Sequence, residues 1–437
     1  MGGGKPKRHL IPSEFSANSA TPSVGDNACH TGCIVTWYYM NARRKPSRTS
    51  ADREGRILRR RNAFLALVRR FPGISRQECA RLLGVSTFSV SRLARQLIDE
   101  NIVQESDPEP TPGAGQGRPS LPLRLNGDHE FYAGVDLEAL HWRFVVIDFA
   151  GNPVHRVEHA FHRCANSAAY AELLSHLLSE EVRKCGALWT RVRALGVAAP
   201  GRLDSTSRTI TEYATLPGFR NIPILDLHHS ASGKPVTVLN NVACLAVHDL
   251  WHHAPPDSSE RIDLHAAVRS GIGCVLTYRG RILSGSHNHA GHLGSFPVPG
   301  PDGLTVPLET LAGISALRAR LPDAPDGLWR GETKAVRQAM ENSDFGVVLS
   351  TAMQALARTL AGTAAILDPG EIVLHSPLFR EENELWKMLV ELYECSQQSD
   401  AGRETTLCRS QTAEFGPAIG AGLHALEQHY PTRQSTA

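Results

Sequence analysis

The chain has 437 residues, of which 41% are hydrophobic and 21% are charged. This composition excludes a single small module and a chain that is disordered throughout. Lys and Arg number 46 and Asp and Glu number 44, so the formal net charge is only +2. Binding of a polyanion by bulk charge is therefore excluded, and any nucleic-acid site must be local.

The cysteines and the apolar runs indicate the compartment. The nine cysteines are scattered and odd in number, which argues against a secreted disulfide framework. No apolar run approaches the roughly 20 residues that span a bilayer, and the first residues lack an apolar signal core. We therefore expect a cytoplasmic protein without a membrane partner.

Residues 1–50 mix Ser, Pro, Gly and Asn without helical or strand periodicity, and we predict a disordered extension there. Met40 is an alternative translation start, because every recognisable pattern lies after it. Neither alternative assigns the segment a function.

Residues 51–106 are predicted to form a winged helix-turn-helix domain. A helical stripe begins near Arg56 and ends at Pro72-Gly73. Ser75-Arg76-Gln77-Glu78 is a capping box for a second, short helix. Gly84 makes the turn, and Ser86 offers the cap of a third helix. Two helices joined in this way can place the second one in the major groove of DNA.

Local charge favours DNA binding over the alternative, an ordinary helical hairpin. Between residues 52 and 105 there are 11 arginines against 6 acidic residues. The third helix carries hydroxyl and guanidinium groups opposite its apolar stripe, and these groups suit base edges. The predicted DNA-binding residues in this part are Ser86, Thr87, Ser89, Ser91, Arg92 and Arg95. The expected partner is a duplex DNA operator.

Residues 107–121 are rich in Pro and Gly and are predicted to be a linker or wing. Arg118 stands between Gly117 and Pro119. An Arg held in extended backbone can enter a narrow A·T minor groove, so Arg118 is a further candidate for DNA contact. The alternative is a plain basic linker.

Residues 122–437 alternate between strand and helix patterns. Strand-like runs cover 131–137 and 142–148, a helical pattern follows over 168–185, and 194–199 is a short apolar strand. A second hairpin pattern covers 266–278. Two such units predict a duplicated α/β architecture with a cleft between its lobes.

The chain resembles the ROK family of bacterial sugar kinases and sugar-responsive repressors. The resemblance rests on an ordered set of motifs at residues 117–122 (GRPSLP), 134–137 (GVDL), 197–201 (VAAPG), 216–220 (LPGFR), 366–369 (ILDP) and 416–421 (GPAIGA). It implies a two-lobed, actin-like (ribonuclease H-like) ATPase fold for residues 122–437. The preceding helix-turn-helix is a feature of the repressor branch, for which we expect a homodimer or a higher homo-oligomer.

The groups that this family uses for phosphoryl transfer are altered. Family kinases have an Asn-Asp pair whose Asp acts as general base, whereas this chain has Asn240-Asn241, and an amide cannot accept that proton. Glu138 stands where kinases carry a glycine, and Arg269-Ser270 lies where the second phosphate loop is expected. The resemblance therefore implies no catalytic residue, no cofactor and no enzymatic activity.

The structural zinc of the family is not expected either. Ser295 stands at the position of the zinc-ligating His, and the stretch between Pro297 and Thr310 has no cysteine. A structural zinc takes about four nitrogen or sulfur ligands. We predict no metal.

The resemblance also assigns a ligand site for a sugar or a related small molecule. The candidate residues are Gly201, Arg202, Asn240, Asn241, His292 and Glu309. A sugar site needs such convergent polar groups. The alternative is a scaffold role, in which Glu309 caps the helix of residues 311–317 and Asn240 closes a turn.

Three functions follow from these observations. The first is a transcriptional regulator, such as a repressor, whose C-terminal domain senses a ligand and sets the spacing of two recognition helices. The second is an active ATP-dependent sugar kinase with an accessory DNA-binding segment. The third is a constitutive DNA-binding protein whose C-terminal domain only dimerises.

Overall fold

The computed structural model describes residues 50–106, 121–138, 141–161, 164–204, 209–212, 218–253, 261–286, 290–397, 404–412 and 414–430. The chain divides into two units, Met1–Ile57 and Leu58–Ala437. Of the first unit only residues 50–57 are described. The expected disordered extension and the candidate Arg118 lie outside the described residues.

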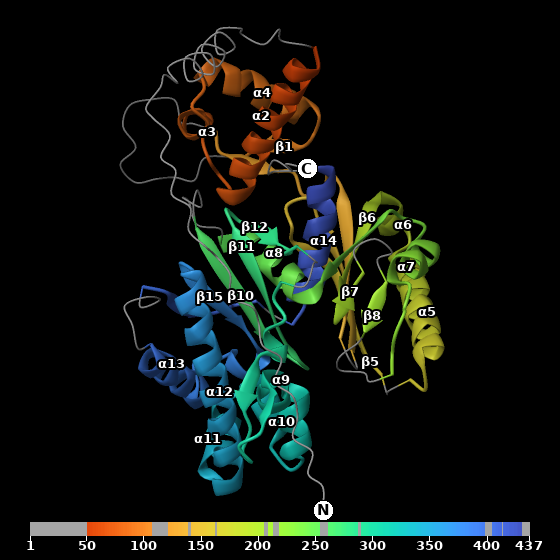
Figure 1. Cartoon of the computed structure of the whole chain (residues 1–437). Helices are drawn as coiled ribbons and strands as arrows, with labels where there is room; N and C mark the ends of the chain where they lie inside the picture. The colour runs from red at the N-terminus through yellow and green to blue at the C-terminus, as the bar shows by residue number, and fades with distance from the viewer. Residues whose placement is uncertain are drawn as a thin grey trace, which may run out of the picture. The chain divides into compact units, whose positions relative to one another are not determined.

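Three helices and a strand pair form the N-terminal part of the described chain (Figure 1). They are α2 (Ser50–Arg70), α3 (Arg76–Leu83), α4 (Thr87–Asp99), β1 (Val103–Glu105) and β2 (Leu123–Leu125). β1 and β2 pair in antiparallel orientation, with Val103 opposite Leu125. The first helix begins earlier than the apolar stripe predicts, at Ser50.

Local capping explains the ends of these helices. The Ser75 hydroxyl accepts the Glu78 N–H at 3.1 Å, and the Ser86 hydroxyl accepts the Ser89 N–H at 3.3 Å. Gly84 ends α3 with a φ of 61°, in the left-handed region that glycine adopts without strain. The predicted caps and turn are confirmed.

The first of two five-stranded sheets has the order β5-β4-β3-β6-β9. Its strands are β3 (Phe131–Leu137), β4 (His141–Asp148), β5 (Pro153–Ala160), β6 (Val192–Ala199) and β9 (Val236–Asn240). β3, β4 and β5 are antiparallel neighbours, whereas β6 runs parallel to both β3 and β9. The elements inserted between these strands are α5 (Ser167–Cys185), α6 (Ala187–Arg191), β7 (Arg202–Leu203), β8 (Ile210–Glu212) and α7 (Ile224–Ser232).

The second sheet repeats this plan in the order β12-β11-β10-β15-β16. Its strands are β10 (Ile262–Val268), β11 (Ile272–Tyr278), β12 (Arg281–Leu283), β15 (Glu371–His375) and β16 (Thr406–Arg409). An antiparallel β10-β11-β12 meander again continues into two parallel strands. The predicted duplicated α/β architecture is confirmed as two mixed sheets.

Helices and short segments surround the two sheets. α8 (Asn241–His253) connects the first sheet to the second. Between β12 and β15 lie η1 (Leu293–Ser295), β13 (Pro297–Pro299), β14 (Thr305–Pro307), α9 (Leu308–Ala312), α10 (Ile314–Arg320), η2 (Asp326–Arg330), α11 (Thr333–Glu341) and α12 (Ser343–Leu367). The chain continues with η3 (Pro377–Phe379), α13 (Glu384–Ser396) and, after β16, α14 (Gly416–His429).

Glycines allow α14 to pack closely on the first sheet and on α8. A Cβ at Gly196 of β6 would lie 1.9 Å from the Ala421 carbonyl oxygen, and a Cβ at Gly420 would lie 1.8 Å from the Cys244 carbonyl oxygen. Backbone-to-backbone contact of this kind leaves no room for a side chain. The GPAIGA motif therefore has a packing role in this fold.

Among the described helices, none is long and apolar enough to cross a membrane.

Candidate functional site

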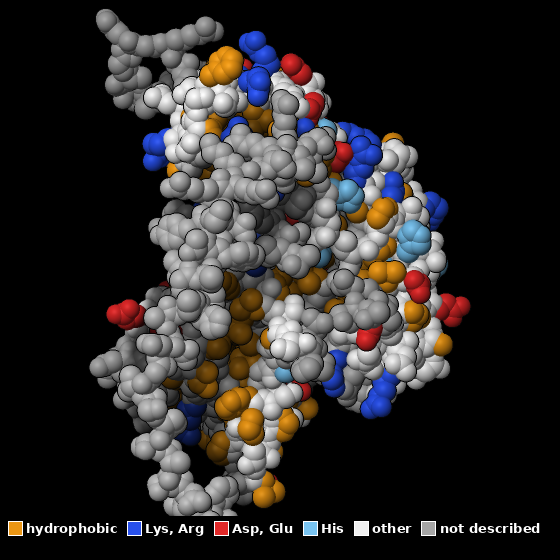
Figure 2. All heavy atoms as spheres, turned by 45° about the horizontal axis from the view of Figure 1, so that its top comes forward, with side chains coloured by type: hydrophobic (Ala, Val, Ile, Leu, Met, Phe, Trp, Pro, Cys, Tyr) orange, Lys and Arg blue, Asp and Glu red, His pale blue; other side chains and the backbone are white. Residues whose placement is uncertain are grey.

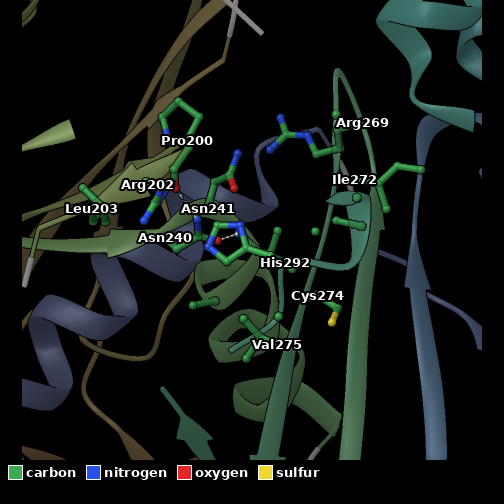
Figure 3. A pocket seen from close by; sticks show the side chains of 18 of the residues that line it. Pro200, Arg202, Leu203, Asn240, Asn241, Arg269, Ile272, Cys274, Val275 and His292 are labelled. Carbon is green, nitrogen blue, oxygen red and sulfur yellow. Dashed lines mark hydrogen bonds between the residues drawn. The ribbon is translucent and has the colours of Figure 1, made fainter. Parts of the chain in front are cut away.

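A cavity of about 400 Å³ is lined by loops and element ends from both sheets (Figure 3). All six residues predicted to bind a ligand line it: Gly201, Arg202, Asn240, Asn241, His292 and Glu309. The structure thus brings these residues together, whereas their role in binding stays a prediction.

The parallel pairing of β6 and β9 builds one wall of the cavity. Ala199 lies opposite Asn240 in the register, so both strands end at the same edge of the sheet. Gly201 follows with a φ of 73°, which turns the chain towards β7. The Asn240 side-chain amide donates to the Gly201 carbonyl at 3.3 Å and holds the two loops together.

Asn240 also has the turn role that the sequence left as an alternative. Its side-chain oxygen accepts the Val242 N–H at 2.9 Å, in the first turn of α8. Asn241, the first residue of α8, is half-buried and lines the cavity. Figure 3 shows Asn241 and Arg202 on the same side of the cavity.

The loop around Gly291 positions His292. Gly291 has a φ of 96°, and a Cβ there would lie 1.9 Å from the Cys274 carbonyl oxygen. The Cys274 N–H donates to the Gly291 carbonyl at 2.8 Å, which fixes the loop on β11. His292 is exposed and lies beside Asn240 in the view of Figure 3.

Glu309 is half-buried in the first turn of α9. Its Oε2 would lie 2.8 Å from a Cβ at Gly294, so Gly294 leaves the space for this carboxylate. The N-terminal caps of α9 and α10 are Pro307 and Gly313, and neither makes a side-chain capping hydrogen bond. A carboxylate in the first turn of a helix also stabilises the helix dipole, so the scaffold role stays an alternative for Glu309.

An ion-pair cluster joins two hairpins that contribute to the lining of the cavity, β3–β4 and β10–β11. Arg269, in the β10–β11 turn, places its Nη2 3.0 Å from the Asp136 Oδ2 of β3 and also forms an ion pair with Glu138. The neighbouring Ser270 hydroxyl donates to Glu138. The two positions that the sequence singled out as altered are thus bonded to each other.

Asp136 is the buried centre of this cluster, with no exposed surface. Arg143 of β4 lies 3.4 Å from the same carboxylate oxygen as Arg269. Burial raises the pKa of Asp136, and the two guanidinium groups act in the opposite direction. Sequence reasoning missed this cluster, although an Arg in one phosphate loop together with a Glu in the other was the available signal.

The candidate DNA-binding residues lie on α4 and at its N-terminus. Thr87, Arg92 and Arg95 are exposed, and Ser89 and Ser91 are half-buried. The exposed Ser86 caps the helix. The opposite side of α4 is buried through Val90, Ala94 and Leu97. Figure 2 shows basic side chains on the surface of the N-terminal helices, and the basic residues of these helices are all arginines.

A contact that the sequence did not predict connects α2 to the α/β part. The Arg69 guanidinium lies 3.7 Å from the ring centre of Trp251 in α8, and its Nη1 lies 3.5 Å from Glu427 in α14. Helix α8 therefore has Asn241 at the cavity and Trp251 against α2.

Known proteins with similar sequences or folds include both regulators and kinases. The chain is 24% identical over 326 residues to the uncharacterized protein y4fQ of Sinorhizobium fredii, a match that covers 73% of this chain and 77% of the relative. A crystal structure of a ROK family transcriptional regulator, a homolog of the E. coli MLC protein, has a similar fold. Its TM-score is 0.63 at 17% identity, over 86% of this chain and 97% of the other.

A ROK hexokinase from Thermus thermophilus is also similar, with a TM-score of 0.52 at 25% identity over 68% of this chain and 99% of the hexokinase. The ROK family pattern itself matches residues 132–428, which include both sheets and every residue of the cavity named above. This chain belongs to the ROK family.

Proposed function

We propose that this protein is a sequence-specific DNA-binding transcriptional regulator whose α/β part senses a sugar or a related small molecule. The observation that carries this proposal is α4, a capped helix that follows α3 after a tight turn and exposes Arg92 and Arg95 opposite a buried face. Together with the β1–β2 pair, the three helices fit a winged helix-turn-helix. In such a unit α4 would enter the major groove.

The extent of the fold likeness supports this assignment. The regulator structure matches 86% of this chain, whereas the hexokinase structure matches 68%. The family pattern begins at residue 132, after α2, α3 and α4. The regulator structure therefore covers more of this chain than the hexokinase structure does, as expected if this chain also has an N-terminal DNA-binding part.

The cavity supports a small polar ligand. Its volume of about 400 Å³ lies within the roughly 300–1,000 Å³ of small-molecule sites. An arginine, two asparagines, a histidine and a carboxylate converge on it. Hydroxyl groups of a sugar can donate to Glu309 and accept from Arg202 or Asn241.

The second candidate function is a sugar kinase, which the likeness to the hexokinase favours. Two features weigh against it. Asn241 cannot act as the general base, and Arg269 bonds to Asp136 and Glu138 at the edge where ATP phosphates are expected. A phosphate there would have to displace Arg269 and approach two carboxylates.

Helix α8 offers a route from the ligand to DNA. A ligand that contacts Asn241 would act on the start of α8, and Trp251 near its end contacts Arg69 of α2. If the ligand favours one position of α8, it also favours one arrangement of the DNA-binding helices. Linkage then requires DNA to change ligand affinity by the same factor.

DNA selection with the full-length protein tests the proposal. Duplexes selected from a random pool should share a two-fold-symmetric site whose half-sites lie about 34–36 Å apart. Arg92→Ala and Arg95→Ala should each weaken binding by about 1–3 kcal/mol, if each side chain contacts a guanine. Arg183→Ala removes an exposed arginine of α5 and should leave binding unchanged. Unchanged affinity in both α4 variants would remove α4 as the DNA-binding helix.

A ligand screen separates a sensor from a constitutive DNA-binding protein. Sugars and polyols that bind the native cavity should raise the melting temperature of the full-length protein. A ligand found in this way should also change operator affinity. If no sugar in a broad panel raises the melting temperature or changes operator affinity, the sensor proposal is wrong and a constitutive DNA-binding protein is the better explanation.

A further inference from the structure

Three side chains of types that bind metals, one aspartate and two histidines, meet in the core of the second sheet, outside the lining of the cavity. Asp249 lies in α8, His265 in β10 and His375 in β15. The parallel register pairs His265 with Val373 and Ala267 with His375, so both imidazoles belong to the same face of the sheet. Helix α8 packs on β10 and brings Asp249 to them.

The distances between the three groups fit a metal ion. The His375 Nε2 lies 3.3 Å and the His265 Nδ1 3.8 Å from the Asp249 Oδ2, and the two nitrogens are 3.5 Å apart. The point equidistant from these three atoms lies about 2.1 Å from each, close to the length of a zinc–imidazole or zinc–carboxylate bond. We propose that Asp249, His265 and His375 bind a divalent first-row transition metal such as Zn²⁺.

The surroundings of Asp249 are those of a metal ligand. Its relative exposure is 8%, and His265 and His375 are 3% and 4% exposed. Burying a carboxylate costs several kcal/mol unless a cation or several hydrogen bonds offset it. The Thr412 hydroxyl donates to Asp249 at 2.6 Å, and the Ser410 hydroxyl donates at 3.4 Å. Hydroxyl groups that orient a ligating carboxylate are common around metal sites.

A metal at this position would hold α8 to β10 and β15. Three protein ligands leave a further position for water. The proposal departs from the expectation, drawn from the sequence, that the chain binds no metal. The ligands escaped notice in the sequence because they come from three separate elements without a short spacing pattern.

Zinc content and melting temperature test the site. The untagged full-length protein is stripped with a chelator, returned to buffer with Zn²⁺ alone, and passed over a desalting column. We expect about one zinc per chain and a higher melting temperature than that of the stripped protein, because a ligand selective for the native state stabilises it. A wild-type protein without stoichiometric zinc, or with the same melting temperature in both states, would overturn the proposal whatever the variants do.

Two variants separate a metal site from a hydrogen-bonded network. His265→Asn and His375→Gln place a side-chain amide near the former Nδ1 and Nε2, so they can still donate to Asp249 but lose the imidazole ligand. Both should lose the zinc, and their melting temperatures should no longer respond to it. His176→Gln changes a histidine on α5 that is 68% exposed and should keep the zinc. Zinc content equal to wild type in both core variants would overturn the proposal.

Thr412→Val tests the surrounding hydroxyl. Loss of such a partner should weaken zinc affinity by about 10- to 100-fold without abolishing it. If the core variants fail to fold, X-ray absorption of the zinc-loaded wild type decides instead. Imidazole and oxygen neighbours support the site, and sulfur neighbours overturn it.

Discussion

Two groups of polar residues at the cavity are used differently. Arg202 and Asn241, next to the ends of β6 and β9, line the cavity together with Glu309 of α9. In the β3–β4 and β10–β11 hairpins, Arg269 instead bonds to Asp136 and Glu138. The first group can offer polar atoms to hydroxyl groups, whereas the second satisfies its charges internally.

A sugar needs hydrogen-bond partners on one wall, and phosphoryl transfer also needs a base and an accessible edge for the phosphates. The difference therefore teaches that one fold can keep the groups that ligand binding requires while it changes those that phosphoryl transfer requires. The following predictions test whether the two groups of residues differ in this way, starting with the largest expected effect.

Phosphoryl transfer should be absent. With ATP and a panel of sugars, the purified protein should show no turnover near the roughly 1–100 per second of kinases. The reason is the missing base at Asn241 and the ion pairs of Arg269. A coupled assay for ADP checks this, and turnover at such rates would show that the phosphate side is intact.

Arg269→Ala should lower the free energy of unfolding by about 3 kcal/mol, because it leaves a buried carboxylate with one guanidinium group fewer. Urea unfolding measures the loss. Adding Asp136→Asn should recover part of it, since the buried charge is then gone. Arg337→Ala breaks an exposed pair with Glu384 and should cost at most about 1 kcal/mol. Equal losses in the two single variants would contradict the importance of the cluster.

Glu309→Gln should weaken the binding of the ligand by about 1–3 kcal/mol, because a carboxylate is a stronger acceptor for hydroxyl groups than an amide. More ligand should then be needed to change operator affinity. DNA binding without ligand should stay intact, since Glu309 lies outside α2, α3 and α4, to which the proposal assigns DNA binding. Glu341→Gln, an exposed change on α11, is the matched control. Operator affinity measured with and without ligand gives the effect, and loss of DNA binding in folded Glu309→Gln would refute the sensor role.

Arg69→Gln should lower the free energy of unfolding by about 2 kcal/mol, because it removes a cation–π contact between two largely buried side chains. The substitution should mainly reduce the coupling factor, which is the factor by which ligand changes operator affinity. Its effect on the affinity for ligand alone, or for operator alone, should be smaller. Arg70→Gln serves as control, because Arg70 contacts Phe71 of the same segment instead. If both variants keep the full coupling factor, α8 does not transmit the ligand signal through Arg69.

The sequence predicted the local features of the fold well. The caps at Ser75 and Ser86 and the turn at Gly84 depend on residues a few positions away, so their patterns are readable. The apolar runs at 131–137, 142–148, 194–199 and 266–278 correspond to β3, β4, β6 and the β10–β11 hairpin, whereas β9, β12, β15 and β16 were not predicted. The start of α2 at Ser50 was missed, because the apolar stripe begins only later and surface helical residues carry little signal.

The six cavity residues were named from family motifs, and the tertiary structure determined that they share one cavity. By itself the sequence determined the helix caps and the alternation of strands and helices, and the resemblance to the family added the prediction that Asn241 stands in place of the base. Only the tertiary structure decided that Arg269 bonds to Asp136 and Glu138, and that Asp249 meets His265 and His375. Such pairs join distant parts of the chain, and sheet register and helix packing bring them together.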